Sequence, residues 1–196
     1  MTKADKTKEI IIEKVSEVFN KKGYYGTSLS DLINITGLSK GSIYGNFKNK
    51  EEVAVEAFNY NMNIITKSFN MEINKYSNST DRLLAYVEVY RRENDKYILS
   101  GGCPLLNTLV ESDDMGGVLK ELSVDVVKKW KKNITKIINS GIKEREIKPK
   151  TDSENIAGLM ISLFEGAGIL TKATGDSSYM VNALNHVESL VLGIKV

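Results

Sequence analysis

The chain is poor in the residues that build disulfide frameworks and metal sites. Its 196 residues include one cysteine, two prolines, one histidine and one tryptophan. A single cysteine excludes a disulfide framework within the chain and is typical of proteins in a reducing cytoplasm. The single histidine, His186, has no second histidine or cysteine cluster with which to share a metal ion. We therefore predict that the protein needs neither a metal nor another cofactor.

The sequence also lacks the signatures of common nucleotide-dependent enzymes and metalloproteases. It contains no G-x-x-x-x-G-K, no H-E-x-x-H and no glycine-rich dinucleotide fingerprint. Only Cys103 and His186 could pair as nucleophile and base, and nothing in their spacing favours this. We expect no enzymatic activity. A turnover that Cys103→Ala abolishes would support the contrary interpretation.

Long hydrophobic runs are missing as well. The first six residues are polar and lack the apolar core of a signal peptide. The most apolar run, Ile156 to Leu170, contains Ser162 and Glu165 and is shorter than the roughly 20 residues of a membrane span. We interpret this run as a helix buried on most sides, and we expect a cytoplasmic protein with no membrane partner.

Charge is unevenly distributed along the chain, although the formal net charge is only +2. Residues 1–50 contain nine lysines and five acidic residues, a net charge of +4. The remaining residues contain 18 basic and 20 acidic residues, a net charge of −2. A phosphate-binding module needs a local excess of cations, and the first fifty residues provide one.

Residues 28–52 predict two short helices separated by a glycine turn and followed by a third helix. Ser28 and Asp31 form a capping pair, so the first of these helices should begin at residue 29. Gly37 should end it, because the residue just past a helix commonly has a left-handed backbone. Ser39 can cap the second helix, which is short and rich in small polar residues.

The second helix is predicted to bury Ile43 and Phe47, which are one turn apart, and to expose its other side. Each glycine in an exposed helix costs about 1 kcal/mol relative to alanine, but glycine allows a partner surface to approach closely. Lys50 begins the next helix. A cation in the first turn interacts unfavourably with the helix dipole, and a contact with a DNA phosphate would explain why lysine stands there. Small polar side chains suit hydrogen bonds to base edges and phosphates. The predicted DNA-binding residues are Ser28, Ser30, Ser39, Lys40, Gly41, Ser42, Tyr44, Asn46, Lys48 and Lys50. The alternative is a helical hairpin that only packs.

This segment resembles the TetR family of bacterial transcriptional regulators. The matching elements are F-x-x-x-G at residues 19–23, T-G-L-S-K-G at residues 36–41 and I-Y-x-x-F-x-N-K-E-E at residues 43–52. The strong match covers about residues 8 to 58, and the remainder matches in helix layout. Asn46 stands where the family commonly has histidine, so the base preference is expected to differ. The resemblance implies a helix-turn-helix protein that binds a DNA operator.

No segment shows the period-two alternation of a strand, so we predict an all-α fold of about nine helices. The resemblance divides it into a helix-turn-helix DNA-binding domain of three helices in residues 1–50 and a helical ligand-binding and dimerisation domain in residues 51–196. Outside the motif, the predicted helices span residues 6–21, 50–74, 81–99, 105–112, 117–141, 153–171 and 179–192.

The last two predicted helices are candidates for a dimer interface. Gly158, Gly166 and Gly168 would let another helix approach the first of them closely. The second has a narrow apolar seam at 4-3-4-3 spacing, which suits helix–helix packing: Met180, Leu184, Val187, Val191 and Ile194. The alternative is that both helices complete the core of one chain. The resemblance implies a homodimer through helices 8 and 9, whose paired recognition helices would read a palindrome.

A small-molecule pocket in residues 51–196 is implied mainly by the resemblance. An apolar lining with a few polar groups, which include Glu111, suits such a site. The alternative is ordinary core packing. The effector would be a small apolar or aromatic molecule that releases a repressor from DNA; a DNA-binding factor without any ligand is the competing hypothesis. The predicted ligand-binding residues are Phe58, Met62, Ile65, Phe69, Tyr86, Tyr90, Cys103, Leu106, Asn107, Leu109, Trp130, Ile134, Phe164 and Glu165.

Cys103 has a second possible function. It precedes a predicted helix in a Gly-Gly-Cys-Pro break, where the helix dipole would lower the pKa of a thiol. Some TetR-like regulators that sense electrophiles have a similar stretch, matched here by Cys103, Asn107, Glu111 and Asp113. An electrophile-sensing or redox-sensing repressor is therefore an alternative. A lone cysteine is otherwise a small apolar residue.

Overall fold

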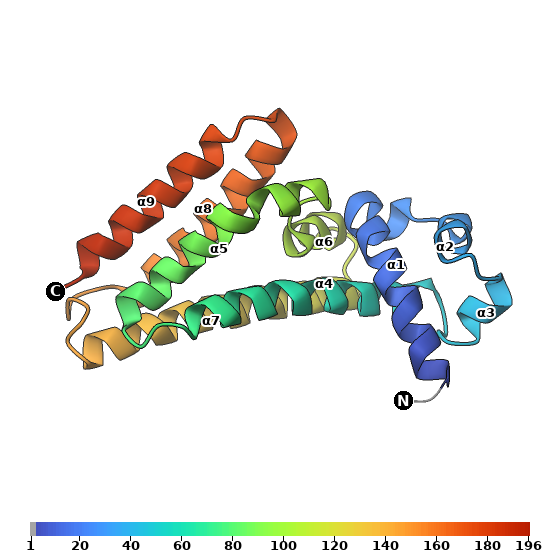
Figure 1. Cartoon of the computed structure of the whole chain (residues 1–196), viewed down its shortest axis with the longest axis horizontal. Helices are drawn as coiled ribbons and strands as arrows, with labels where there is room; N and C mark the ends of the chain where they lie inside the picture. Colours follow the sequence, from blue (N-terminus) through green and yellow to red (C-terminus); the bar gives the residue numbers. More distant parts are fainter. Residues whose placement is uncertain (1–2) are drawn as a thin grey trace. The chain divides into compact units, whose positions relative to one another are not determined.

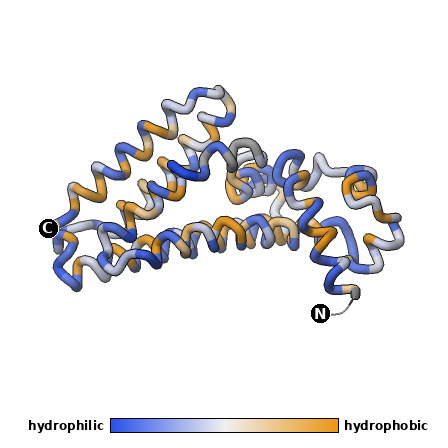
Figure 2. The backbone as a smooth tube through the Cα atoms, in the orientation of Figure 1, coloured by the Kyte–Doolittle hydropathy of each residue, from blue (hydrophilic) through white to orange (hydrophobic). Residues whose placement is uncertain are grey.

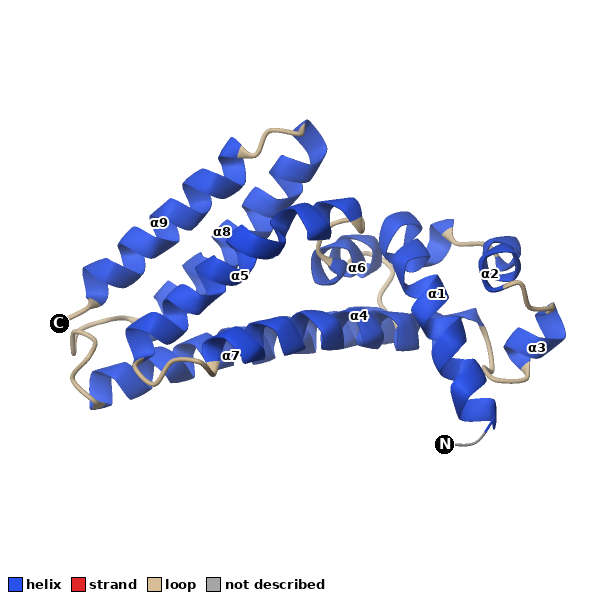
Figure 3. Cartoon of the chain, in the orientation of Figure 1, coloured by secondary structure: helices blue, strands red, loops and turns tan. Residues whose placement is uncertain are grey.

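The computed structural model describes residues 3–196, and the side chains of all of these except 3, 94 and 96–99. The described range is all-α, as predicted, with nine helices and one isolated bridge between Ile147 and Lys195 (Figures 1 and 3). The helices are α1 (Lys3–Gly26), α2 (Leu29–Thr36), α3 (Lys40–Tyr44), α4 (Lys50–Ile73), α5 (Ser79–Leu99), α6 (Pro104–Ser112), α7 (Val118–Lys143), α8 (Ser153–Thr174) and α9 (Ser178–Ile194).

Two helix ends differ from the prediction for identifiable reasons. Helix α1 was expected to run to about residue 21 and to end at Gly23; regular helix does stop there, where φ is 75° and ψ is 175°, and a short helical segment then continues to Gly26. Helix α8 was expected to end at residue 171, but it continues to Thr174 because Gly175, with φ 73°, supplies the left-handed C-cap.

Packing divides the chain into two compact units. The first comprises the residues up to Ile65 together with Ser100–Val124, and the second comprises Thr66–Leu99 and Asp125–Val196. Helices α4 and α7 each contribute to both units. The predicted division at residue 50 concerns function rather than packing, and it stays a prediction.

The core of the first unit is built from amphipathic helices. Helix α1 packs against α2 and α6, and α2 packs against α3. Apolar and polar residues alternate along these helices, as Figure 2 shows in orange and blue, so each helix buries one side. The buried residues of this core include Ile11, Val15, Phe19, Leu32, Ile43, Phe47 and Val53.

The second unit has an aromatic core. The ring of Phe164 stacks on Tyr90, with 4.5 Å between ring centroids, and lies 6.4 Å from the ring of Trp130. Phe69 lies 5.3 Å from Tyr86 and 5.4 Å from Tyr90. These rings join α4, α5, α7 and α8, and Phe164 is only 1% exposed.

Helix α9 packs against α8 and α5 within the same chain. Its predicted seam supplies this contact, since Met180, Leu184, Val187 and Val191 are all buried. The interpretation of this seam as a contact with a second chain is therefore wrong, and the alternative of core packing is correct for these four residues.

Helix α8 buries one side only, contrary to the prediction of burial on most sides. Among the described helices it is the one that is long and apolar enough to cross a membrane. Its buried residues, such as Ile156, Met160 and Phe164, face the core of the second unit. The opposite side exposes Leu159, which is 38% exposed, and also Ile169 and Leu170.

Candidate nucleic-acid interface

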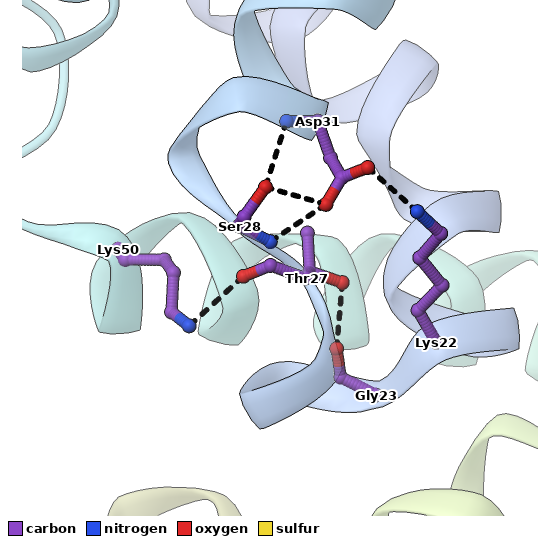
Figure 4. A network of polar contacts seen from close by, with 6 residues as sticks. All are labelled: Lys22, Gly23, Thr27, Ser28, Asp31 and Lys50. Atoms are coloured by element: carbon purple, nitrogen blue, oxygen red, sulfur yellow. Dashed lines mark hydrogen bonds and ion pairs between the residues drawn. The ribbon is translucent and has the colours of Figure 1, made fainter.

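The start of α2 is fixed by the predicted capping box. The hydroxyl oxygen of Ser28 accepts a hydrogen bond from the Asp31 amide at 3.1 Å, and Asp31 accepts from the Ser28 amide at 2.8 Å and hydroxyl at 2.7 Å. The Lys22 ammonium binds the other carboxylate oxygen of Asp31 at 2.6 Å, which ties α1 to α2 (Figure 4). The hydrogen bond from Lys22, and to a smaller extent those from Ser28, hold the pKa of Asp31 well below its usual range. The box is therefore ionised and intact at neutral pH.

The corner between α1 and α2 is held by side chains that bind its backbone. The Thr27 hydroxyl donates to the carbonyl of Gly23 at 2.6 Å. The Lys50 ammonium donates to the carbonyls of Thr27 at 3.0 Å and Tyr24 at 2.7 Å, and lies 4.3 Å from the centre of the Tyr24 ring. These contacts explain a lysine in the first turn of α4 without any phosphate. Since an ammonium has three N–H groups, one remains for a phosphate.

Helix α3 has the predicted orientation. Gly37 ends α2 with φ 70°, and the Ser39 hydroxyl accepts a hydrogen bond from the Ser42 amide at 3.2 Å. Ile43 of α3 is 0% exposed; Phe47, which was expected on the same helix, is 2% exposed but lies beyond the end of α3 at Tyr44. The remaining sides of α3 therefore face away from the core, as the sequence predicted.

The outward side of α3 and its flanks has two cations that lack protein partners. Lys40 and Lys48 are exposed, and within the described range neither forms an ion pair or a side-chain hydrogen bond. Ser30 and Gly41 are also exposed. Phosphates could therefore bind both ammonium groups without breaking an existing contact.

The other predicted DNA-binding residues have internal contacts or are partly buried. Ser28 and Ser39 use their hydroxyls as helix caps, and the Asn46 amide donates to the carbonyl of Ser42 at 2.8 Å. Ser42, Tyr44, Asn46 and Lys50 are half-buried. Contact of these residues with DNA stays a prediction.

Nothing in the protein itself requires glycine at position 41. A Cβ atom added there would meet only the hydroxyl oxygen of Ser39, at 4.0 Å, and its backbone φ is not positive. The fold therefore has room for a side chain at this exposed position, and close approach of a partner surface to Gly41 stays a prediction.

Sequence reasoning missed the contact that joins α6 to the end of α1. The two carboxylate oxygens of Glu111 accept hydrogen bonds from the amides of Tyr24, at 2.8 Å, and Tyr25, at 2.9 Å. Gly23 has φ 75° and ψ 175°, a conformation that is essentially restricted to glycine. A Cβ atom at Gly23 would lie 2.4 Å from Glu111 Oε1, so the carboxylate also needs glycine there.

A second polar contact between α6 and α1 lies beside the first. The side-chain amide of Asn107 donates to the backbone carbonyl of Asn20 at 3.1 Å, to the side-chain oxygen of Asn20 at 2.9 Å and to the backbone carbonyl of Gly101 at 2.8 Å. The Asn20 amide donates to the carbonyls of Ser100 and Gly102. Asn107 and Glu111 were expected to contact a ligand; in the structure both side chains bind α1, and ligand contact stays a prediction. Residues 20 and 107 are 87 positions apart, and no local pattern relates them.

The predicted ligand-binding residues fall into both units. Phe69, Tyr86, Tyr90, Trp130 and Phe164 form the aromatic core of the second unit. These rings contact one another as core residues do, so the core-packing alternative describes their contacts. Ligand binding by these residues stays a prediction. The buried Ile134 and the half-buried Glu165 also belong to this unit.

In the first unit, Phe58 borders a cavity of about 20 Å³, which is large enough for roughly one water molecule. Cys103 is half-buried at the N-cap of α6 and forms no disulfide. Its backbone carbonyl accepts a hydrogen bond from the backbone amide of Asn107 at 3.0 Å. Its position before a helix N-terminus is confirmed, and its reactivity stays a prediction. The other predicted ligand-binding residues of this unit are half-buried: Met62, Ile65, Leu106 and Leu109.

Two sequence profiles match the chain. Residues 11–57 match the profile described as "Bacterial regulatory proteins, tetR family". Residues 79–187, more than half of the chain, match "Tetracyclin repressor-like, C-terminal domain". The two matches cover the helix-turn-helix segment and most of the helices that follow it.

Solved structures and a curated relative are similar over the whole chain. A TetR-family transcriptional regulator from Cytophaga hutchinsonii is 41% identical, with a TM-score of 0.94, and the match covers 100% of this chain and 98% of that one. A TetR transcriptional regulator from Chloroflexus aurantiacus is 32% identical with the same TM-score and the same coverage. The HTH-type transcriptional regulator YxaF of Bacillus subtilis is 24% identical over 193 residues, which are 97% of this chain and 98% of that protein.

The α6–α1 contact generates the first prediction. Glu111→Gln preserves shape but replaces one acceptor oxygen with an NH₂ group, so the Tyr24 or Tyr25 amide loses its acceptor. A partly buried amide without an acceptor costs about 1–3 kcal/mol, and we expect the lower end of this range because Tyr25 is 56% exposed. Urea unfolding should show the lost stability, and hydrogen exchange should show faster exchange of these two amides. Asp114→Asn, an exposed carboxylate just after α6, is the control. Equal stability and exchange in both variants would refute the role assigned to Glu111.

Proposed function

The chain belongs to the TetR family of bacterial transcriptional regulators, which are DNA-binding proteins and not enzymes, and we propose that it is a ligand-responsive repressor that binds a palindromic operator as a homodimer. The observation that carries the proposal is the outward side of α3, where exposed Lys40 and Lys48 flank a glycine that the fold does not need. The description of the second matching profile as repressor-like favours repression over activation. Such a regulator acts on DNA in the bacterial cytoplasm.

The proposed contacts follow from the directions of these side chains. Helix α3 would enter the major groove, as the second helix of a helix-turn-helix does. The ammonium groups of Lys40 and Lys48 would bind phosphates on either side, while Ser42 and Tyr44 reach base edges or the backbone. Gly41 would lie where the helix approaches the DNA most closely.

The proposed dimer interface uses the exposed side of α8 together with α9. At 100° per residue, the exposed apolar residues of α8 and two of its glycines lie within about 120° of the helix surface. A Cβ atom added at Gly158 or Gly166 would meet nothing within 4 Å, so the single chain does not need glycine at either position. A second helix packed closely against this side would need it. Val181 and Leu192 of α9 are 51% and 50% exposed and extend the apolar surface.

The proposed signal is a small molecule with an apolar or aromatic body that binds the second unit. Helix α4 is the physical link, because it begins at Lys50, which holds the α1–α2 corner, and continues to Phe69 in the aromatic core. A ligand that favours one position of α4 would shift the population between a DNA-competent state and an incompetent one. A shift from 1:99 to 99:1 requires a preference of about 5.5 kcal/mol for one state.

The salt dependence of DNA binding tests the proposed phosphate contacts. Lys40→Gln and Lys48→Gln should each weaken operator binding and reduce the slope of log K against log salt by about one, because each removes one phosphate contact. Fluorescence anisotropy with an operator duplex at several salt concentrations measures both quantities. Lys132→Gln, which removes an exposed lysine of α7, should change neither. Slopes that are identical for all three variants would exclude these contacts.

Gly41 gives a test that separates folding from binding. Gly41→Ala should leave stability unchanged or raise it by up to about 1 kcal/mol, because alanine is the better helix former and has space here. Operator affinity should nevertheless fall at least about tenfold, since the added methyl group keeps the helix from the groove. Thermal unfolding and anisotropy on the same sample give the two results. Unchanged affinity would mean that α3 does not approach DNA at this residue.

The dimer interface is tested by placing charges on the exposed side of α8. The double variant Leu159→Glu and Ile169→Glu should sediment as a monomer, because burying unpaired carboxylates in an interface is strongly unfavourable. Operator binding should be lost at the same protein concentration although the helix-turn-helix is unchanged. Met71→Glu, at a 63% exposed position of α4, should remain a dimer. A wild-type protein that sediments as a monomer at micromolar concentration would contradict the model of paired half-sites.

A further inference from the structure

The second unit contains a half-open cavity that the predicted ligand set does not describe. Its volume is about 260 Å³, and its walls come from α4, α5 and α7. Of the predicted ligand-binding residues, only Tyr86 borders it. The cavity therefore shares Tyr86 with the aromatic core, but the rings of Phe69, Tyr90, Trp130 and Phe164 do not border it.

Two cations border the cavity, and no acidic residue does. Within the described range, neither the Arg82 guanidinium nor the Lys136 ammonium forms an ion pair or a side-chain hydrogen bond. Positive groups gathered in a concave surface raise the local concentration of anions. The cavity thus offers two uncompensated cationic donors to a ligand.

The nearby carboxylates already bind other groups. Asp81 accepts from the side-chain amide of Asn78 at 2.6 Å, and Glu146 accepts from the Ser79 amide at 2.6 Å. Glu72 accepts from Lys75 at 2.9 Å and from Arg92 at 2.7 Å. Within the described range, none of these three carboxylates forms an ion pair with Arg82 or Lys136.

The floor of the cavity is apolar and its rim is polar. Ile73 and Ile137 are 5% exposed and Tyr86 is 4% exposed. Burial raises the pKa of Tyr86 to about 12, so its hydroxyl stays neutral at physiological pH. Exposed carboxamides at Asn70 and Asn133 add donors and acceptors at the rim. Six of the nine residues that border the cavity are polar or charged, so its lining favours a ligand with a charged or polar group over a purely apolar one.

The volume limits the size of a ligand. It corresponds to roughly eight or nine water molecules at about 30 Å³ each. It lies just below the range of about 300–1,000 Å³ that is typical of drug-sized ligands. A single ring or short chain with one polar group fits this volume, whereas a nucleotide or a long acyl chain does not.

We propose that this cavity binds a small organic anion, a carboxylate or a phosphate monoester on a ring or short chain, whose charged group is held by Arg82 and Lys136. The ring or chain lies on Ile73, Ile137 and Tyr86, and the carboxamides orient the anionic group. The proposal has two parts: that the cavity binds the anion, and that the anion is the effector which controls DNA binding. Only the second part rests on the proposed function. Binding of the anion depends on the cavity alone.

Calorimetry with the full-length protein tests whether the cavity binds an anion. The probes are phenyl phosphate, benzoate, benzyl alcohol and benzylamine, which share an aromatic ring and differ in charge. At least one of the two anions should bind saturably, and the neutral and cationic probes should bind at least about tenfold more weakly. Which anion binds more tightly distinguishes a phosphate site from a carboxylate site. The fluorescence of Trp130, the only tryptophan and one helical turn from Asn133, gives an independent reading.

Substitutions of Arg82 and Lys136 test whether these two cations hold the anion. Arg82→Gln and Lys136→Gln should each raise the Kd of the anion about tenfold or more, because each removes a charge-assisted hydrogen bond. Lys128→Gln removes an exposed lysine of the same helix, outside the cavity, and should leave the Kd unchanged. Lys136 is exposed, so its variant tests the site even where Arg82→Gln fails to fold.

Three results would overturn the site: equal binding of benzyl alcohol and the anions, equal loss of affinity in Lys128→Gln, or no anion binding where a Kd of about 1 mM would be detected.

Anisotropy with operator DNA separates the two parts of the proposal. Release of DNA by the anion in the wild type but not in Lys136→Gln supports both parts. Anion binding that depends on Arg82 and Lys136 without DNA release keeps the site and rejects its role as the effector site. Absence of operator binding by the ligand-free protein rejects the proposed function and leaves the anion site intact.

Discussion

The arrangement of the helix-turn-helix depends on how polar side chains hold the backbone where α1 gives way to α2. Gly23 turns the chain with φ 75°, and its neighbouring amides and carbonyls then need partners. Glu111 accepts from two of these amides, and Lys50 donates to two carbonyls further along. The capping box of α2 begins one residue after Thr27, so these contacts hold the backbone that leads directly into α2.

Five glycines of the chain fall into two groups with different physical reasons. The fold needs glycine at position 23 because its φ is 75°, and at position 141 because a Cβ atom would lie 2.6 Å from Ile147 Cδ1 and 2.7 Å from Ser79 Cβ. Gly41, Gly158 and Gly166 have space for a side chain and no positive φ. Each of these three lies on an exposed or half-exposed helix surface, one on α3 and two on α8. These are the two surfaces that we propose for contact with DNA and with a second chain.

The second unit contains two environments of opposite character, and the predicted ligand set includes the rings of the first but only Tyr86 from the border of the second. The rings around Phe164 fill the space between their helices and contribute to stability through burial and ring contacts. The cavity beside Arg82 and Lys136 is instead open and positively charged. An apolar effector would have to separate packed rings, whereas an anionic one can bind without displacing the aromatic core.

Local sequence determined the features that involve residues within about four positions of one another. The capping box at Ser28, the left-handed Gly37, the cap at Ser39 and the inward direction of Ile43 were all predicted, because each depends on helix geometry alone. The motif spacing also identified the family, since its matching residues are consecutive in one segment.

Tertiary structure decided which partner each side chain meets when the partner is distant in sequence. The Lys50 ammonium binds carbonyls 23 and 26 residues away, and the side chain of Asn107 binds a residue 87 positions away; neither contact was predicted from the sequence. The apolar seam of α9 shows the same limit, because 4-3-4-3 spacing requires a packing helix without specifying which chain supplies it. Periodicity defines the side of a helix that must be buried, and only the docking of whole helices determines what buries it.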